Sequence, residues 1–225
     1  MSESKLLDSV ILEPKSEHKA TVIWLHGLGA DGHDFEPIVP QLQLPESLGI
    51  KFIFPHAPII PVTINNGYPM RAWYDIRNAD LAQREDQKGV KQSAGFIMEF
   101  IQAELDNGIP ADKIILAGFS QGGAVTLHLA TRLDFKIAGV IALSTYLTMA
   151  DHLAEEKADA NLATPIFMAH GSQDPVVPMQ RAQFSAKTLT DSGFQVLWQD
   201  YPMPHAVCPP EITAVSQYIQ RQLTD

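Results

Sequence analysis

The sequence predicts one α/β domain, residues 1–225, in which a mostly parallel central sheet carries helices on both faces. Apolar, β-branched runs alternate along the chain with helix-like stretches, the order typical of strands joined by crossover helices. The runs are short and continuously apolar, which indicates strands buried on both faces. The length of 225 residues fits a single larger α/β domain, and neither a repeat nor a linker divides it.

Seven apolar runs are predicted to be strands, in the order Ser9–Leu12, Thr21–His26, Lys51–Phe54, Lys113–Ala117, Ile137–Leu143, Pro165–Ala169 and Gln195–Gln199. Five stretches between them are predicted to be helices: Phe35–Leu42, Asp86–Asn107, Gln121–Arg132, Pro178–Ser192 and Pro210–Leu223. Two helices end in Asn107-Gly108 and Ser192-Gly193, which are typical C-terminal stops. The segment from Pro55 to Asp80 is predicted to be one long irregular loop, and such loops are usually functional or mobile.

The overall charge argues against some classes of partner. With 16 basic and 26 acidic residues the formal net charge is -10, and an acidic surface repels the phosphates of nucleic acids. Charges, Gly or Pro interrupt every apolar run, so we expect no integral membrane segment. The N-terminal sequence lacks the apolar core of a signal peptide, and a single cysteine, Cys208, leaves no internal disulfide. We therefore expect a cytoplasmic protein.

A first glycine motif lies in W-L-H-G-L-G-A-D-G-H-D-F, from Trp24 to Phe35. It contains G-x-G-x-x-G after a predicted strand, where a dinucleotide-binding fingerprint would lie, and so raises the possibility of an NAD(P)-dependent oxidoreductase. Asp31 and Asp34 within the loop would repel a pyrophosphate. No acidic residue ends the next strand to bind a ribose. The sequence therefore predicts no cofactor here.

A second motif, Gly118 to Gly122, reads G-F-S-Q-G and matches G-x-S-x-G around Ser120. It stands between a predicted strand and a predicted helix, as a nucleophilic serine at a strand-to-helix corner requires. Side chains two positions before or after the serine would collide at this corner, which explains the glycines. The helix N-terminus also supplies free N–H groups and partial positive charge. The alternative is a glycine-rich corner with an incidental serine.

Partners for the serine can be sought by chain order, because α/β-hydrolases place nucleophile, acid and histidine in that sequence. Asp174 follows the predicted strand Pro165–Ala169, and His205 is the only histidine beyond it. Each candidate lies after the carboxyl end of a strand, where open α/β sheets bind ligands. Asp200, at another strand end, is the rival acid. His170 is the rival histidine, but it precedes Asp174 and is interpreted as structural.

An oxyanion formed by serine attack needs two hydrogen-bond donors. One is the N–H after the serine, from Gln121, and the other should come from a loop after an early strand. Only Thr21–His26 is an early strand followed by a glycine-dense loop, so the first motif can supply that donor. His26 itself is interpreted as structural. Neither H-E-x-x-H nor paired C-x-x-C occurs, so no metal site is expected, and Cys208 is interpreted as a packed thiol.

Six stretches together resemble the carboxylesterase / acyl-protein thioesterase family of small α/β-hydrolases, which includes bacterial carboxylesterases. They are W-L-H-G-L-G-A-D-G-H-D-F at Trp24, F-P-H-A-P at Phe54, M-R-A-W-Y-D-I at Met70, A-G-F-S-Q-G-G at Ala117, H-G-S-Q-D-P-V-V-P at His170 and Y-P-M-P-H at Tyr201. They span most of the chain and are far more specific together than G-x-S-x-G alone.

The resemblance implies an α/β-hydrolase fold and a set of site residues. The expected roles are a triad of Ser120, Asp174 and His205, oxyanion donors Leu28 and Gln121, and acyl-pocket residues Trp73 and Val176. The 55–80 segment should border that pocket. The chain departs from the family pattern beside the histidine, where Pro204 and Ala206 replace a common acidic residue and serine.

The resemblance leaves the substrate open among small carboxylic esters, S-acylated proteins and lysophospholipids. Short- to medium-chain esters are the favoured reading, because bacterial relatives are usually named for them. A non-catalytic hydrolase fold used for binding is the alternative from another class. We expect a small-molecule ester or acylated substrate as partner, no nucleic acid, and a homodimer, since relatives often pair.

Overall fold

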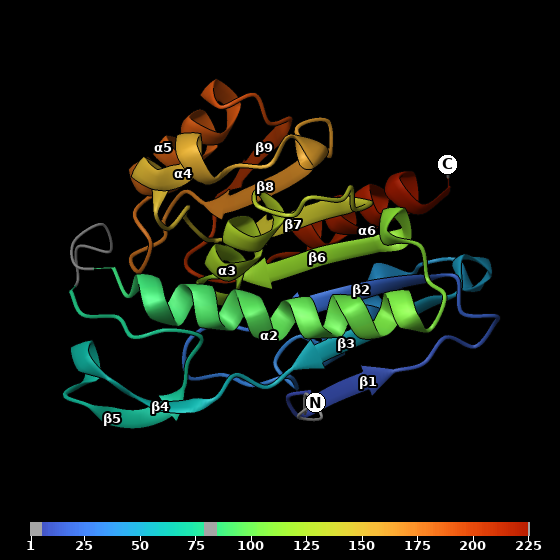
Figure 1. Ribbon diagram of the computed structural model, residues 1–225, viewed down its shortest axis with the longest axis horizontal. Helices are drawn as coiled ribbons and strands as arrows, with labels where there is room; N and C mark the ends of the chain where they lie inside the picture. The colour runs from blue at the N-terminus through green and yellow to red at the C-terminus, as the bar shows by residue number, and fades with distance from the viewer. Residues whose placement is uncertain (1–5, 79–84, 225) are drawn as a thin grey trace.

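A seven-stranded sheet in the order β1-β3-β2-β6-β7-β8-β9 forms the centre of the protein, as Figure 1 shows for the computed structural model, which describes residues 6–78 and 85–224. Its strands are β1 (Ser9–Leu12), β2 (Ala20–Leu25), β3 (Ile50–Pro55), β6 (Ile114–Phe119), β7 (Gly139–Leu143), β8 (Ile166–Gly171) and β9 (Val196–Tyr201). Every neighbouring pair is parallel except β1 with β3. The predicted mostly parallel sheet is therefore confirmed.

Helices cover both faces of this sheet, also as predicted. They are α1 (Val39–Leu42), α2 (Gln87–Asp106), α3 (Gln121–Ala130), α4 (Leu153–Glu156), α5 (Met179–Asp191) and α6 (Pro209–Thr224). The apolar sides of α2, α3 and α5 pack into one core, and those of α1 and α6 pack into a second core on the opposite face. Figure 1 shows α2 in front of the sheet and α6 behind it. Both faces of the strands are consequently buried, which explains their continuous apolar sequence.

Two helices end where the glycines predict. Gly108 and Gly193 have φ angles of 88° and 96°, in the left-handed region that favours glycine. After α5, the Phe194 N–H donates to the Leu189 carbonyl at 3.0 Å, the bond that closes such a terminus. These two glycines end α2 and α5, and the chain then returns to the sheet.

The predicted helix Phe35–Leu42 is only partly correct. The structure has a 3-10 turn over Glu36–Ile38, followed by the single α-helical turn α1. Pro37 and Pro40 lack the N–H groups that a continuous helix would use, so their spacing limits the segment to two short turns. Further 3-10 turns lie at Glu46–Leu48, Thr63–Asn65, Ala111–Lys113, Ala150–His152 and Asp159–Asn161.

The expectation of one irregular loop from Pro55 to Asp80 is wrong in the central part of that segment. Strands β4 (Ile59–Val62) and β5 (Tyr68–Arg71) pair there as an antiparallel hairpin, which projects from the main sheet in Figure 1. Prolines obscured these strands in the sequence, because Pro61 and Pro69 are residues that strands usually exclude. Residues 79 and 80 of the predicted loop lie outside the described residues.

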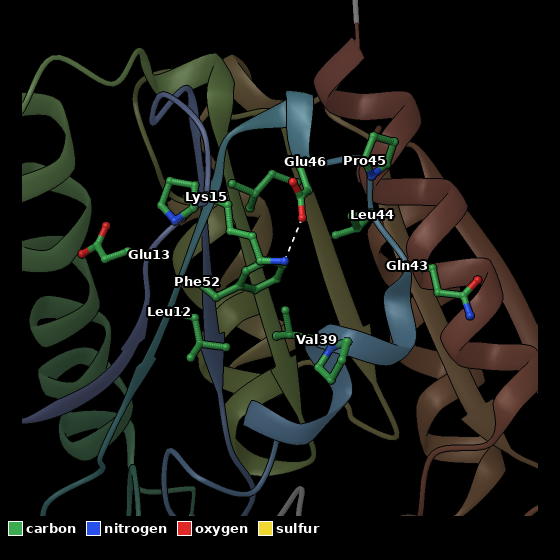
Figure 2. A pocket seen from close by; sticks show the side chains of 12 residues that line it. Leu12, Glu13, Lys15, Val39, Gln43, Leu44, Pro45, Glu46 and Phe52 are labelled. Carbon is green, nitrogen blue, oxygen red and sulfur yellow. Dashed lines mark hydrogen bonds and ion pairs between the residues drawn. The ribbon is translucent and has the colours of Figure 1, made fainter.

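A cavity of about 320 Å³ opens between α1 and the first residues of β3 (Figure 2). Its apolar floor includes Ile50 and Phe52, and an ion pair of 2.7 Å between Lys15 and Glu46 crosses its rim. The part of β3 that lines this cavity is its amino-terminal half. The lining includes none of the predicted site residues. The substrate site must therefore be sought elsewhere, at the carboxyl ends of the strands.

Tyr218 attaches α6 to the start of two strands. Its hydroxyl donates to the Pro165 carbonyl at 2.5 Å and accepts from the Val140 N–H at 3.0 Å. Its ring packs against Phe167 with centroids 5.6 Å apart. This contact lies at the amino ends of β7 and β8, the edge of the sheet opposite Ser120.

Replacing Tyr218 with Phe should lower the free energy of unfolding by about 1 kcal/mol, because the half-buried Pro165 carbonyl loses the hydroxyl that donates to it. Urea denaturation measures this quantity. Tyr68→Phe is the matched control, because that side chain is exposed and should be neutral. A Tyr218→Phe protein as stable as the parent would contradict this reading.

Candidate active site

Ser120 occupies a strained corner between β6 and α3. Its φ and ψ angles are 52° and -119°, a backbone conformation that residues other than glycine rarely adopt. A Cβ on Gly118 would lie 2.5 Å from the Gly122 carbonyl carbon, and one on Gly122 would lie 2.5 Å from the His26 oxygen. The structure thereby confirms why the positions on either side of the serine are glycine.

Bonds from the end of β7 and from Thr145, two residues beyond it, hold this corner in place. The Ser120 N–H donates to the Leu143 carbonyl at 2.9 Å, and its carbonyl accepts from the Thr145 hydroxyl at 2.6 Å. Every residue of α3 is buried, so the helix cannot shift without disturbing the core. Its N-terminus directs free N–H groups and partial positive charge toward the serine.

Three predicted residues form a continuous hydrogen-bonded chain. His205 Nε2 lies 2.9 Å from Ser120 Oγ, and His205 Nδ1 lies 2.6 Å from Asp174 Oδ2. The other carboxylate oxygen of Asp174 accepts the N–H groups of Val176 and Val177 at 2.8 and 2.9 Å. The Asp174 carboxylate is fully buried, with its oxygens occupied by donors. The side chain can therefore hold His205 in one orientation.

The rival acid is not at this site. Asp200 is exposed on β9, whereas the turn after β8 carries Asp174 inward to His205. Among the described contacts, no hydrogen bond or ion pair joins Asp200 to His205. The structure thus brings Asp174, and not Asp200, to the histidine, as chain order favoured.

A direct backbone contact joins the acid turn to the histidine loop. The Gln173 N–H donates to the Met203 carbonyl at 3.1 Å. A Cβ on Gly171 would lie 2.4 Å from the carbonyl oxygens of Met203 and Pro204, so only glycine permits this approach. Sequence reasoning missed this residue, although glycine directly after His170 in H-G-S-Q-D was a visible signal. Pro204 is exposed, and its carbonyl accepts the Ala206 N–H at 2.9 Å.

His170 lies beneath the acid turn and takes no place in the chain to Ser120. Its Nε2 lies 2.9 Å from the Val177 carbonyl and 3.5 Å from Asp174 Oδ2. Burial lowers the pKa of His170, while the Val177 carbonyl and the Asp174 carboxylate act in the opposite direction. Its interpretation as a structural residue agrees with this position.

The first glycine motif lies against the serine. A Cβ on Gly27 would be 3.3 Å from the Phe119 ring and 3.5 Å from the Ser120 Cβ, so the loop passes directly beside Ser120. The backbone N–H groups of Leu28 and Gln121 have no acceptor among the residues that the structure describes. Two free donors are thus available near Ser120.

The two predicted pocket residues lie in different environments. Trp73 is buried, and its indole N–H donates to the His26 carbonyl at 2.9 Å. Val176 has 57% of its surface exposed. The Gln121 side chain bonds to the backbone on this side of the site. Its oxygen accepts the backbone N–H of Trp73 at 2.9 Å, and its nitrogen donates to the Tyr74 carbonyl at 2.7 Å. Sequence reasoning assigned only the backbone of Gln121 and missed this clamp.

Other candidate features add no second centre. Within the described part of the chain, no three side chains of His, Cys, Asp or Glu come together in a way that could hold a metal ion. Cys208 is half-buried immediately before α6 and is a free thiol. Across residues 6–78 and 85–224, every helix is too short or too polar to cross a lipid bilayer.

Comparison with known proteins places these features in a family. The sequence model described as Phospholipase/Carboxylesterase matches residues 7–223. Acyl-protein thioesterase 1 of Neurospora crassa is 42% identical over 217 residues, which cover 92% of this chain and 89% of that protein. Acyl-protein thioesterase 1 of Gibberella zeae is 38% identical over 223 residues, 95% of each chain.

Solved structures of similar proteins have the same fold. The crystal structure of Zea mays acyl-protein thioesterase 2 has a TM-score of 0.85 and 31% identity, and the match covers 96% of this chain and 99% of that one. Arabidopsis thaliana SOBER1 has a TM-score of 0.86 and 28% identity, with coverage of 91% and 99%. The mostly parallel sheet with helices on both faces is the α/β-hydrolase fold that these neighbours share.

Buried histidines should make stability depend on pH. Burial lowers the pKa of His26 to about 4 and that of His128 to about 3. In the unfolded chain both titrate near pH 6.5, so between about pH 6.5 and 4 the unfolded state binds protons that the folded state excludes. The free energy of unfolding should therefore fall with decreasing pH, by up to about 1.4 kcal/mol per unit for each histidine.

Urea denaturation from pH 7.5 to 4.5 measures this slope, and His128→Leu should make it shallower because one excluded proton is removed. His128 is suited to the substitution, since its Nδ1 is buried without a partner among the described residues. An identical slope in the two proteins would contradict the assignment.

Proposed function

The chain is a serine hydrolase that belongs to the phospholipase/carboxylesterase family of α/β-hydrolases, and on that premise we propose that it cleaves carboxylic esters through an acyl-enzyme on Ser120. One observation carries the proposal: the hydrogen-bonded chain from Asp174 through His205 to Ser120. A buried acid, an imidazole and a strained serine in this order form the arrangement that activates a hydroxyl as a nucleophile.

In the first half-reaction, Ser120 Oγ attacks the carbonyl carbon while His205 Nε2 removes its proton. Asp174 keeps the other ring nitrogen protonated and stabilises the imidazolium that forms. When the tetrahedral intermediate collapses, His205 returns the proton to the leaving alcohol or thiol, and the acyl group remains on Ser120. The 2.9 and 2.6 Å separations place each proton donor within reach of its acceptor before substrate arrives.

The negative charge of the intermediate is stabilised by the backbone N–H groups of Leu28 and Gln121. Both are free for a ligand, and the second also lies at the positive end of α3. One such donor is worth about 3–4 kcal/mol of transition-state stabilisation. In the second half-reaction a water molecule attacks the acyl carbon, with His205 again as base, and releases the carboxylic acid.

Within this chemistry, short- to medium-chain carboxylic esters are the proposed substrates, with Trp73 and Val176 bordering the acyl chain. Deacylation of S-acylated proteins is the second candidate. It is favoured by the similar proteins of Neurospora crassa and Gibberella zeae, both named acyl-protein thioesterase 1. Lysophospholipids are a third substrate class open to the same residues. The oxidoreductase alternative loses its basis, because the glycine loop lies against Ser120.

We also propose the partners and the cellular location of the protein. They are a small-molecule ester or an acylated chain as the substrate, no nucleic acid, a cytoplasmic location and a homodimer. The net charge of -10 supports the exclusion of nucleic acid. Light scattering at several concentrations tests the oligomeric state directly.

Replacing Ser120 with Ala should reduce ester turnover by a factor on the order of 10⁶, because the nucleophile is lost while the fold is kept. Hydrolysis of a p-nitrophenyl ester measures turnover, and covalent labelling by a fluorophosphonate should disappear in the same variant. Cys208→Ala is the control and should retain both. Nearly intact hydrolysis in Ser120→Ala would refute the proposed function.

The two substrate candidates separate in a ladder of p-nitrophenyl esters of increasing chain length, assayed beside an S-acylated peptide. A carboxylesterase should show its highest kcat/KM on short or medium oxygen esters. An acyl-protein thioesterase should instead prefer the peptide thioester. The measurement is the ratio of kcat/KM values, and a ratio above about tenfold in favour of the peptide would replace the first candidate by the second.

A further inference from the structure

His26 follows β2 directly, and both nitrogens of its buried ring are engaged. The Ala57 N–H donates to Nε2 at 3.0 Å. Since a backbone N–H can only donate, Nε2 carries no proton, and the single proton of the neutral ring is on Nδ1. Nδ1 lies 2.7 Å from the Gly27 carbonyl oxygen and therefore donates to it.

The Gly27 carbonyl belongs to the same peptide group as the Leu28 N–H. In a planar trans peptide these two groups point in opposite directions, and the described residues contain no cis peptide bond. A bond that fixes the carbonyl of Gly27 consequently fixes the direction of the Leu28 N–H. Hydrogen bonding to the carbonyl also polarises the peptide and strengthens its N–H as a donor.

The next peptide group is fixed as well. The Gly29 N–H donates to the Arg71 carbonyl at 2.8 Å, and the Ala30 N–H turns back to the Gly27 carbonyl at 3.3 Å. Leu28 thus lies between two restrained peptide groups while its own N–H stays free. The loop is held in the form that a donor needs before any ligand is present.

His26 is itself restrained by Trp73, which also bonds to Gln121. It packs against the Trp73 ring at a centroid distance of 5.2 Å, and the indole N–H holds the His26 carbonyl at 2.9 Å. The backbone N–H of Trp73 in turn donates to the side-chain oxygen of Gln121. One network therefore connects the residues that carry both proposed donors, Leu28 and Gln121.

We propose that His26 is a positioning residue of the reaction: its Nδ1–H orients the peptide group that presents the Leu28 N–H to the oxyanion. The inference rests on the proposed function, because it assigns His26 to that same oxyanion site. His26 does not touch the substrate. It acts through the Gly27–Leu28 peptide, and its effect should appear when charge develops on the substrate oxygen.

Two substitutions separate the ring nitrogens. In His26→Asn the amide nitrogen takes the place of Nδ1 and can still donate to Gly27. In His26→Gln the side-chain oxygen takes the place of Nε2, so it can accept from Ala57 but leaves Gly27 without its donor. We expect kcat to fall about 10–100-fold in the Gln variant and less than about fivefold in the Asn variant, with KM within about twofold in both.

A trifluoromethyl ketone that forms a tetrahedral adduct on Ser120 supplies a second readout. Its affinity should fall in parallel with kcat in His26→Gln and should be retained in His26→Asn, because the adduct carries the oxyanion. Equal losses of kcat in the two variants, or a change confined to KM, would overturn the proposal. Thermal denaturation of both variants shows whether any loss follows stability instead, and kcat that follows stability would also overturn it.

A measurement on the unaltered protein needs neither variant to fold. Nitrogen-15 NMR of the imidazole should show the Nδ1–H tautomer of His26 at neutral pH, and the Nε2–H tautomer would overturn the proposal. The outcomes also separate the two levels of inference. Hydrolysis that survives Ser120→Ala refutes the proposed function, whereas Ser120-dependent hydrolysis with no difference between the Asn and Gln variants refutes only the role of His26.

Discussion

One backbone conformation supports everything else at this site: Ser120 at φ 52° and ψ -119°. Such a conformation lowers the stability of the fold by about 1–3 kcal/mol and persists only where the surrounding structure enforces it. Here the close packing of Gly118 on Gly122 enforces it, together with the bonds from Leu143 at the end of β7 and from Thr145. This conformation sets Ser120 directly after β6 and directly before the first N–H groups of α3. The proposed nucleophile and the proposed anion-stabilising donor of Gln121 therefore come from the same turn.

The parallel sheet explains how distant residues meet at this turn. His205 is 85 residues from Ser120 and 31 from Asp174 in sequence, yet all three follow the carboxyl ends of strands. The β8–β9 pairing continues to Gly171 opposite Tyr201, which delivers the acid turn and the histidine loop side by side. The backbone bond from Gln173 to Met203 then fixes their spacing. Side-chain geometry is thus set by main-chain pairing.

The geometry was predictable where one residue type has one physical use, as for Ser120 between glycines and for strands buried on both faces. Chain order selected Asp174 and His205, which lie within hydrogen-bond distance of each other; their catalytic roles are the proposal made above. Prediction failed where the role of a residue depends on a contact with a distant part of the chain. The β4–β5 hairpin was hidden by its prolines, and Gly171 matters only because the histidine loop lies on it. His26 looked like any buried histidine until its two hydrogen-bond partners were known.

The parts of the site are not equally durable. Helix α3 is buried on every side, so exposing it requires the whole fold to open. The β4–β5 hairpin is a separate two-stranded sheet with exposed Ile59 and Tyr68, and it can detach at a much lower cost. Yet β5 holds the Gly29 N–H through the Arg71 carbonyl. Heating should thus loosen the peptide proposed to bind the oxyanion before the core opens, so that activity would be lost reversibly below the melting temperature.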